Sequence, residues 1–330
     1  MKKKISFVVP LYYRENKVFD EYNKLSNRDD CLRPYVELKK ALYLKNIIIS
    51  TCDIIPPKEA DLTIFWDIPD TNDLLLKEAI SVKKPIFSII TELGYIHKAN
   101  NNIHLHKCFD KIFTYQDELI NGKKYIKLNY SFRFPDSVKV DYSKKEKLCV
   151  MIAGNKQLNY PNELYSERVR AIRWFEKNHP DDFDLYGIGW GGNKGFLRRI
   201  ISKPYSSYKG QVEEKKITLK KYKFSICYEN AYDVPGWITE KIFDCFFSGC
   251  IPIYWGISNI DKVIPPNCFI DKRKFKNYEE LYTFLSNMTK KEYLEFIKNI
   301  NEYLKSDKKY EFTIEYFLNT VINNITNYLR

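Results

Sequence analysis

Short apolar runs bounded by turn residues recur along the first 115 residues and alternate with segments of helical spacing. These runs have the length of buried strands, and they lie at 5–9, 46–49, 61–66, 84–90 and 111–114. Between them, residues 36–44 and 72–82 carry apolar side chains at helical intervals. Because strands and helices alternate, we expect a parallel sheet with helices on both faces.

A polar stretch at 131–147 interrupts this rhythm. It contains Pro135 and a cluster of lysines, as connecting segments commonly do. The sequence therefore predicts an amino-terminal domain at 1–135 and a linker at 136–147.

A second series of strands and helices follows the linker. Strands are expected at 148–153, 184–186, 224–228 and 251–255, and helices at 164–177 and 239–248. Residues 279–330 are mostly helical by period. We predict a second α/β domain at 148–305 and a final helix at 306–330. Open α/β sheets bind ligands at the carboxyl ends of their strands, so two such domains suit an enzyme with two substrates.

Composition and charge narrow the classes of function. The chain is 44% hydrophobic and 29% charged, which is typical of a globular protein. Its net charge of +12 favours polyanionic partners such as nucleic acid, anionic lipid or phosphorylated small molecules. No nucleic-acid-binding motif is present, so nucleic acid is not expected as a partner. Short lysine runs such as Lys215-Lys216 are interpreted as solvated surface.

The cysteines and the longest apolar runs bear on location. None of the eight cysteines forms a C-x-x-C pair, and several lie in apolar runs, as buried thiols do in a reducing compartment. No run of 18 apolar residues exists. We therefore expect a cytoplasmic protein that is at most peripheral on a membrane.

The segment from 222 to 256 is the most informative part of the chain. A buried strand ends at Glu229-Asn230, a loop with Pro235-Gly236 follows, and a helix begins near Thr239, which can cap it. Gly249 ends this helix. A strand that leads into a helix amino terminus favours a bound phosphate, because amide groups and the helix dipole both attract anions.

This segment resembles the family 10 glycosyltransferases, the α-1,3/4-fucosyltransferases. The resemblance is carried by YENAYDVPGWITEK and SGCIPIYWG, and it extends to GNKQLNYPNELYSERVRAIRWFEK and FDKIFTYQDEL. It covers roughly residues 85–300. It implies an α/β fold of GT-B type, in which two Rossmann-like domains face each other across a cleft.

The resemblance also implies a donor site for GDP-fucose. The residues that it places there are Arg168, Glu229, Asn230, Trp237, Thr239, Glu240 and Lys241. Arg168 and Lys241 would bind the diphosphate, and Glu240 would accept hydrogen bonds from donor hydroxyls. For Glu229, donor binding and a purely structural role are equally compatible with the sequence. The family often has Tyr where this chain has Trp237, so a phenolic hydroxyl is missing here.

Glu92 is the predicted general base. It follows the predicted strand 84–90, at the end from which side chains reach a ligand. In the resembling enzymes a Glu in the corresponding stretch deprotonates the acceptor hydroxyl. Asp67 and His97 are the alternatives.

Together these residues predict an inverting enzyme that moves L-fucose from GDP-β-L-fucose to an N-acetylglucosamine-containing glycan in α-1,3 linkage. The acceptor would be an oligosaccharide or glycoconjugate, such as a bacterial surface-glycan precursor. No metal is required in this scheme, and a divalent ion such as Mn²⁺ would at most stimulate the reaction. The alternatives are a transferase of the same fold that uses another nucleotide sugar, and a non-catalytic nucleotide-sugar or glycan-binding protein.

Two motifs resemble metal sites but are not interpreted as such. Alternating spacing would place His104 and His106 on one face of a strand, near Cys108, yet no further ligand completes a site. Asp182 and Asp184 form a D-x-D pattern, but the pattern precedes a buried strand and the family's phosphate-binding residues are cationic.

Overall fold

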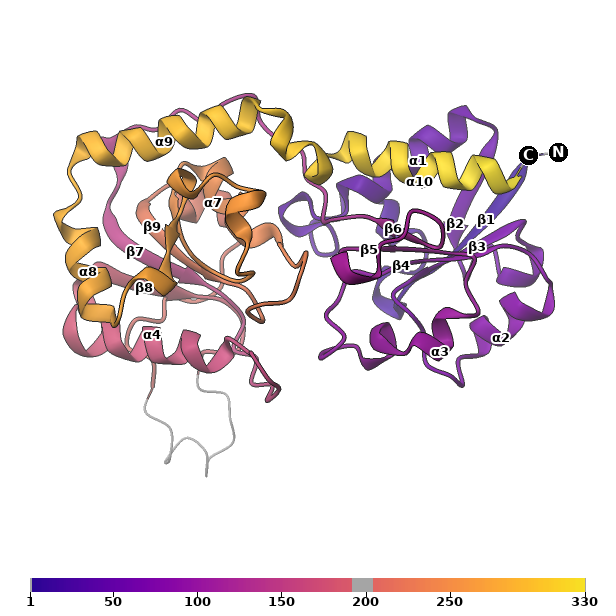
Figure 1. Cartoon of the computed structure of the whole chain (residues 1–330), viewed down its shortest axis with the longest axis horizontal. Coiled ribbons are helices and arrows are strands. Elements are labelled where there is room, and N and C mark those ends of the chain that lie inside the picture. The colour runs from indigo at the N-terminus through magenta and orange to yellow at the C-terminus, as the bar shows by residue number, and fades with distance from the viewer. Residues whose placement is uncertain (1, 192–203, 330) are drawn as a thin grey trace. The chain divides into compact units, whose positions relative to one another are not determined.

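A computed structural model describes residues 2–191 and 204–329, and these divide into two compact units (Figure 1). Unit 1 contains the described chain up to Arg133, the short stretch Pro235–Trp237, and the chain from Tyr310 onward. Unit 2 contains the described parts of Phe134–Val234 and Ile238–Lys309. The predicted linker 136–147 is thus counted with unit 2.

The described part of unit 1 is built on a six-stranded sheet in which every neighbouring pair is parallel. The strand order is β2-β1-β3-β4-β5-β6. The strands are β1 (Lys3–Val8), β2 (Ile47–Thr51), β3 (Leu62–Trp66), β4 (Ile86–Ile89), β5 (Lys111–Thr114) and β6 (Tyr125–Lys127).

Helices from both ends of the chain cover this sheet. They are α1 (Arg33–Leu44), α2 (Leu74–Ser81), α3 (Ile103–His106) and α10 (Ile314–Leu329). In unit 1, α10 lies beside α1 (Figure 1). Its Val321 and Ile325 are buried in one cluster with Leu38 of α1 and with Ile5 and Phe7 of β1. The last helix of the chain therefore completes a core that the first strand begins.

Unit 2 has a five-stranded parallel sheet among its described residues, in the order β11-β10-β9-β7-β8. Its strands are β7 (Lys147–Ile152), β8 (Phe183–Tyr186), β9 (Tyr222–Tyr228), β10 (Ile251–Trp255) and β11 (Ile270–Asp271). Its helices are α4 (Tyr165–Asn178), α6 (Lys215–Leu219), α7 (Glu240–Ser248), α8 (Tyr278–Asn287) and α9 (Lys290–Lys305). None of the described helices of either unit combines the length and apolar character needed to cross a bilayer.

The predicted elements agree with those of the structure except in short segments. The sequence did not predict α3, α6, β6 or β11. The expected strand face for His104 and His106 is wrong, because this segment is the short helix α3. Asn102 begins that helix, since its side chain accepts hydrogen bonds from the amides of His104 and Leu105.

The strand orders place the candidate residues where ligands usually bind. In each sheet the direction of winding reverses once, between β1 and β3 in unit 1 and between β7 and β9 in unit 2. Ligands of doubly wound sheets bind at the carboxyl ends of the strands at such reversals. Asp67 follows β3 and Glu92 comes soon after β4, whereas Glu229 follows β9. Two candidate regions, one in each unit, therefore lie at carboxyl strand ends.

Gly249 ends α7, as predicted, and its position allows a test of packing. Its φ is +60°, and a Cβ at this position would lie 2.3 Å from Cγ2 of Val140. Gly249→Ala should lower the free energy of unfolding by about 1–3 kcal/mol, because backbone strain and overpacking act together. Gly122→Ala is the matched control in urea denaturation, since Gly122 has φ +68° and open space around its Cβ position. Equal losses in the two variants would contradict a role for the Val140 contact.

Candidate active site

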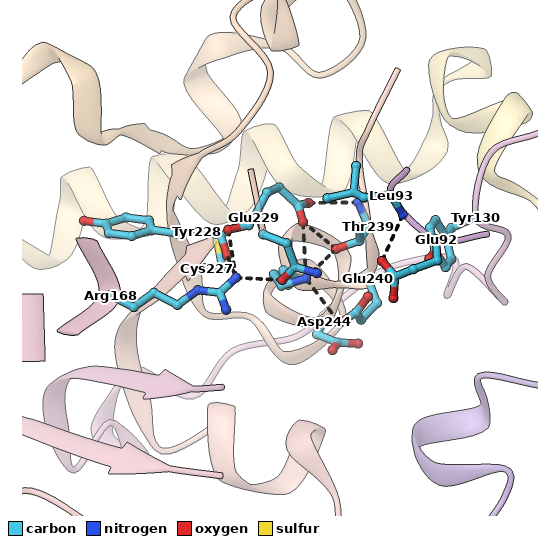
Figure 2. A network of polar contacts seen from close by, with 12 residues as sticks. Glu92, Leu93, Tyr130, Arg168, Cys227, Tyr228, Glu229, Thr239, Glu240 and Asp244 are labelled. Carbon is cyan, nitrogen blue, oxygen red and sulfur yellow. Dashed lines mark hydrogen bonds and ion pairs between the residues drawn. The ribbon is translucent and has the colours of Figure 1, made fainter. Parts of the chain in front are cut away.

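Glu229 connects the end of β9 to the start of α7 (Figure 2). Its carboxylate is completely buried. One oxygen accepts a hydrogen bond from the Thr239 amide at 2.9 Å, and the other accepts from the Thr239 hydroxyl at 2.8 Å and from Nζ of Lys241 at 3.2 Å. A buried carboxylate needs such partners, and these three hold Thr239 and Lys241 in place. The structure thus gives Glu229 a clear structural role. Donor binding by Glu229 stays a prediction.

Thr239 occupies the N-cap position of α7, but its hydroxyl does not cap the helix. The hydroxyl donates to Glu229 and accepts from Nζ of Lys241 at 2.9 Å. The expectation that the Thr239 side chain caps this helix is therefore wrong. The reason is that a cap needs the hydroxyl oxygen to accept from an amide of the first helical turn, and here this oxygen accepts from the Lys241 ammonium while its proton is directed to Glu229.

Charges of both signs gather at the start of α7. Burial alone would lower the pKa of Lys241, but Glu229 and Glu240 outweigh it and raise that pKa, so the ammonium stays protonated. Burial likewise opposes ionisation of Glu240, but Lys241 at 3.7 Å and Lys215 at 3.6 Å hold its pKa well below the ordinary value. The result is a fixed set of charged groups at a helix amino terminus, where an anion is also favoured.

Lys215 is a member of this site that the sequence did not reveal. Its ammonium lies 2.8 Å from the carboxylate of Asp244, and its side chain is only 18% exposed. The interpretation of Lys215-Lys216 as solvated surface is wrong for Lys215, because α6 packs against α7, whereas Lys216 is exposed. Glu240 and Asp244 are four residues apart and share one face of α7, and this spacing was the available signal for a cationic partner.

Arg168 extends from α4 to the end of β9 (Figure 2). Its Nη2 donates to the backbone oxygens of Tyr228 and Glu229, both at 2.7 Å, and to the side-chain oxygen of Asn230 at 3.0 Å. The side chain is buried, so it is not a surface charge. These bonds fix the strand end that carries Glu229, and diphosphate binding by Arg168 stays a prediction.

Trp237 packs within unit 1. Its ring is buried and meets Tyr115 and Tyr130 edge-on, at centroid distances of 4.6 and 5.7 Å. The preceding Gly236 has φ +79°, and a Cβ there would lie 2.0 Å from the backbone oxygen of Tyr115, so only glycine fits. Of the predicted donor residues, six belong to unit 2, and Trp237 is held by aromatic side chains of unit 1.

Glu92 lies beyond the carboxyl end of β4, as predicted for a general base. One oxygen of its carboxylate accepts a hydrogen bond from the Leu93 amide at 3.0 Å (Figure 2). The position agrees with a side chain that meets a ligand at this edge of the sheet.

The two alternative bases are engaged in other contacts. The Asp67 carboxylate accepts four hydrogen bonds, from the amides of Thr91 and Glu92, the Thr91 hydroxyl and the Asn100 side chain. Nε2 of His97 lies 2.6 Å from the backbone oxygen of Ile68. A carbonyl oxygen only accepts, so Nε2 carries the proton, and only Nδ1 of His97 could take another. Glu92 stays the predicted base.

The two metal-like motifs do not gather ligands. Within residues 2–191 and 204–329, no three His, Cys, Asp or Glu side chains come together as a metal site requires. Asp184 is buried and accepts from the Tyr222 hydroxyl at 2.6 Å and from Nζ of Lys147 at 3.0 Å. Asp182 accepts from the Tyr282 hydroxyl at 2.6 Å. Both carboxylates thus have partners within unit 2.

Two parallel α/β sheets, each with candidate residues beyond the carboxyl ends of its strands, define the class of the protein, the GT-B fold of glycosyltransferases. A crystal structure of an alpha1,3-fucosyltransferase superposes with a TM-score of 0.54 over 97% of this chain and 90% of that chain, at 15% identity. A glycosyltransferase from Rickettsia africae gives 0.59 over 100% and 99%, at 11% identity. At these identities the likeness shows the fold alone.

The chain belongs to glycosyltransferase family 10, since the family model "Glycosyltransferase family 10 (fucosyltransferase) C-term" matches residues 142–323, more than half of the chain. An alpha-(1,3)-fucosyltransferase, FucT, of Helicobacter pylori is 40% identical over 74 residues, 22% of this chain and 15% of that protein. An alpha-(1,4)-fucosyltransferase of Arabidopsis thaliana is 39% identical over 67 residues, 20% of this chain and 16% of that protein. The matches thus span only about a sixth of these relatives.

The depressed pKa of Glu240 leads to a prediction for acid stability. A carboxyl group whose pKa is lower in the folded than in the unfolded state stabilises the fold above its unfolded pKa, near 4.5 here. This contribution is lost as the pH falls toward the folded pKa. The free energy of unfolding, measured by urea denaturation, should therefore fall more between about pH 6 and pH 3 for the wild type than for Glu240→Gln. The side chain is 38% exposed, so solvent screening keeps the difference small.

The control for this measurement is Glu213→Gln, which alters an exposed glutamate of the same unit. It should follow the wild-type acid profile. A Glu240→Gln profile that coincides with both would show that Lys215 and Lys241 do not stabilise the Glu240 carboxylate in solution.

Proposed function

We propose that the protein is an inverting fucosyltransferase, which moves L-fucose from GDP-β-L-fucose to a hydroxyl group of an N-acetylglucosamine-containing glycan in α-1,3 linkage. One observation carries the proposal. Lys241 is held by Glu229 and Thr239 in the first turn of α7, at the carboxyl end of β9, where the winding of the unit 2 sheet reverses. Membership of family 10 and the names of the relatives support fucose as the sugar.

On the donor side, the site would stabilise departing GDP. Negative charge develops on the diphosphate as the bond to fucose breaks, and prepositioned cations and helix amides lower the energy of that state. Lys241 supplies a cation that is fixed before the donor binds, since Glu229 and Thr239 restrain it. Glu240 would accept hydrogen bonds from donor hydroxyls. Arg168 would act on the same site by fixing the backbone of Tyr228 and Glu229 and the side chain of Asn230.

On the acceptor side, Glu92 would act as the general base. As the acceptor oxygen bonds to the anomeric carbon of fucose, its proton passes to the Glu92 carboxylate, and the bond from that carbon to the phosphate oxygen breaks. A single displacement inverts the configuration, so the β-linked donor gives an α-linked product. In this scheme the lysine and the helix amino terminus balance the diphosphate charge, and Mn²⁺ would at most stimulate the reaction.

Donor turnover tests the proposal. The purified protein is incubated with an N-acetyllactosamine acceptor and, in parallel, with GDP-fucose, GDP-mannose or UDP-sugars, and nucleotide release is measured. We expect acceptor-dependent release from GDP-fucose, with the α-1,3 linkage established by NMR of the product. Release from UDP-sugars alone would remove the fucosyl assignment. Tight donor binding without turnover on a broad glycan array would instead indicate a non-catalytic binding protein.

A further inference from the structure

Asp67 has an unusual backbone conformation at the end of β3. Its φ is +63°, in the left-handed region that residues other than glycine seldom adopt, although aspartate tolerates it better than most. Its amide continues the sheet by donating to the backbone oxygen of Ile89 in β4, at 2.9 Å. Residues held in such conformations cluster at functional sites. The turn directs the Asp67 side chain onto the chain that follows β4.

One oxygen of Asp67 holds two successive amides of that chain. Oδ1 accepts from the amide of Thr91 at 2.7 Å and from the amide of Glu92 at 3.1 Å. Oδ2 accepts from the Thr91 hydroxyl at 3.0 Å, and this hydroxyl in turn accepts from Nε1 of Trp66 at 2.6 Å. Successive amides bound to one oxygen restrict the backbone on which Glu92 is carried.

Asn100 completes the restraint from the other side. This fully buried amide donates from Nδ2 to Oδ1 of Asp67 at 2.8 Å and to the backbone oxygen of Glu92 at 2.9 Å. Its own oxygen accepts from the Ile68 amide at 2.8 Å. Asp67 and Asn100 therefore bind both backbone polar groups of Glu92, its N–H and its C=O.

We propose that Asp67 is a positioning residue for the transfer reaction: its carboxylate fixes the backbone of Thr91 and Glu92, so that the Glu92 carboxylate is held where it takes the acceptor proton. The inference rests on the proposed function, in which Glu92 is the base. A base must lie within hydrogen-bond reach of the proton that it removes. A misplacement of about 1 Å costs on the order of 10²-fold in rate, so loss of this restraint should be visible in kcat.

Two substitutions separate the carboxylate from the backbone conformation. Asp67→Gly keeps a residue that adopts φ +63° without strain but removes all four accepted hydrogen bonds. It should lower kcat by about 10²-fold and leave the dissociation constant of GDP unchanged. Asp67→Asn keeps an acceptor oxygen for the amides of Thr91 and Glu92, so its kcat should stay within about tenfold of the wild type.

A double-mutant cycle distinguishes positioning from a general structural role. If Asp67 acts through Glu92, then Asp67→Gly should cause no further loss of kcat when Glu92→Gln is already present. Two independent effects would instead multiply. An unchanged kcat in Asp67→Gly, or multiplied losses in the double variant, would overturn the proposal.

Asp110→Gly is the matched control. Asp110 also binds a backbone amide of β4, that of Ile86 at 2.8 Å, but at the amino end of the strand. This variant should lose thermal stability without a fall in kcat. Equal losses of kcat in Asp110→Gly and Asp67→Gly would overturn the proposal, because any weakening of β4 would then suffice.

Three further outcomes can be told apart: a variant that does not fold, a protein that transfers no fucose, and a base other than Glu92. Should Asp67→Gly fail to fold, Thr91→Val enters the same cycle. It removes the hydroxyl bond to Oδ2 of Asp67 and the bond that this hydroxyl accepts from Nε1 of Trp66, and it keeps the Thr91 amide bond to Oδ1. About a tenfold loss of kcat is expected, confined to the background with Glu92. If Thr91→Val keeps the wild-type kcat, the proposal is overturned. Absence of any transfer by the wild type counts against the proposed function itself. If the wild type and Glu92→Gln transfer fucose at the same rate, Glu92 is not the base, and the inference for Asp67 fails with it.

Discussion

Glu92→Gln is expected to lower kcat by about 10²–10⁴-fold, while the affinity for GDP stays near that of the wild type. Glutamine keeps the size and shape of the side chain but cannot accept the acceptor proton. GDP affinity should survive because the proposed diphosphate contacts are made by residues of unit 2, whereas Glu92 belongs to unit 1. The measurements are steady-state transfer from GDP-fucose and calorimetric titration with GDP.

Glu118→Gln provides the control, since Glu118 is an exposed glutamate of the same unit. Its kcat should equal that of the wild type. The pH profile adds a second criterion: the wild-type kcat should fall on the acidic side through one ionisation, and this limb should be missing from the residual activity of Glu92→Gln. A folded Glu92→Gln protein that transfers fucose at nearly the wild-type rate would contradict the assignment of the base.

Lys241→Ala should weaken GDP binding by about ten- to a hundredfold and should also slow turnover. A hydrogen bond to a charged group contributes about 1.5–3 kcal/mol, which corresponds to that range of affinity. The variant also removes one of the three donors to the buried Glu229 carboxylate, so the start of α7 should become less ordered. Combined loss of affinity and kcat distinguishes this variant from Glu92→Gln, in which only kcat falls.

Lys147→Ala is the control for removal of a paired lysine from unit 2. Lys147 begins β7 and pairs with Asp184 at 3.0 Å, at the strand end opposite to the proposed donor site. It should bind GDP as the wild type does.

Raised salt should weaken GDP binding to the wild type only modestly, because the Lys241 side chain is 19% exposed. Unchanged GDP affinity and kcat in folded Lys241→Ala would exclude Lys241 from phosphate binding.

The elements that the sequence predicted well are those set by local pattern. The run 111–114 coincides with β5, and the helical period at 164–177 lies within one residue of α4 at each end. Buried parallel strands and amphipathic helices have periods that are visible along the chain. The segment 222–256 was also readable, because Gly249 and the flanking apolar runs mark the ends of α7.

The contacts that complete the candidate sites could not be predicted in this way. Lys215 pairs with Asp244, 29 residues away, and Asp67 binds the amide of Glu92, 25 residues away. Such pairs depend on how helices and strands pack, and they leave no periodic signal. The left-handed conformation of Asp67 is equally invisible in the sequence, because only three other aspartates of the described chain, Asp29, Asp30 and Asp233, have a positive φ. The buried Trp237 was assigned from a motif, yet its packing partners are set by tertiary structure.

The packing of α10 against α1 has a consequence for biosynthesis. Val321 and Ile325 share a buried cluster with Ile5 and Phe7, so more than 300 residues separate the two halves of one apolar contact. A ribosome delivers the first strand long before the helix that covers it. On a nascent chain, the apolar face of α1 that contacts α10 therefore stays exposed to solvent, or is bound by a chaperone, until α10 has been synthesised. The strands of unit 1 are synthesised first, but the core of unit 1 can be completed only after unit 2 has been synthesised.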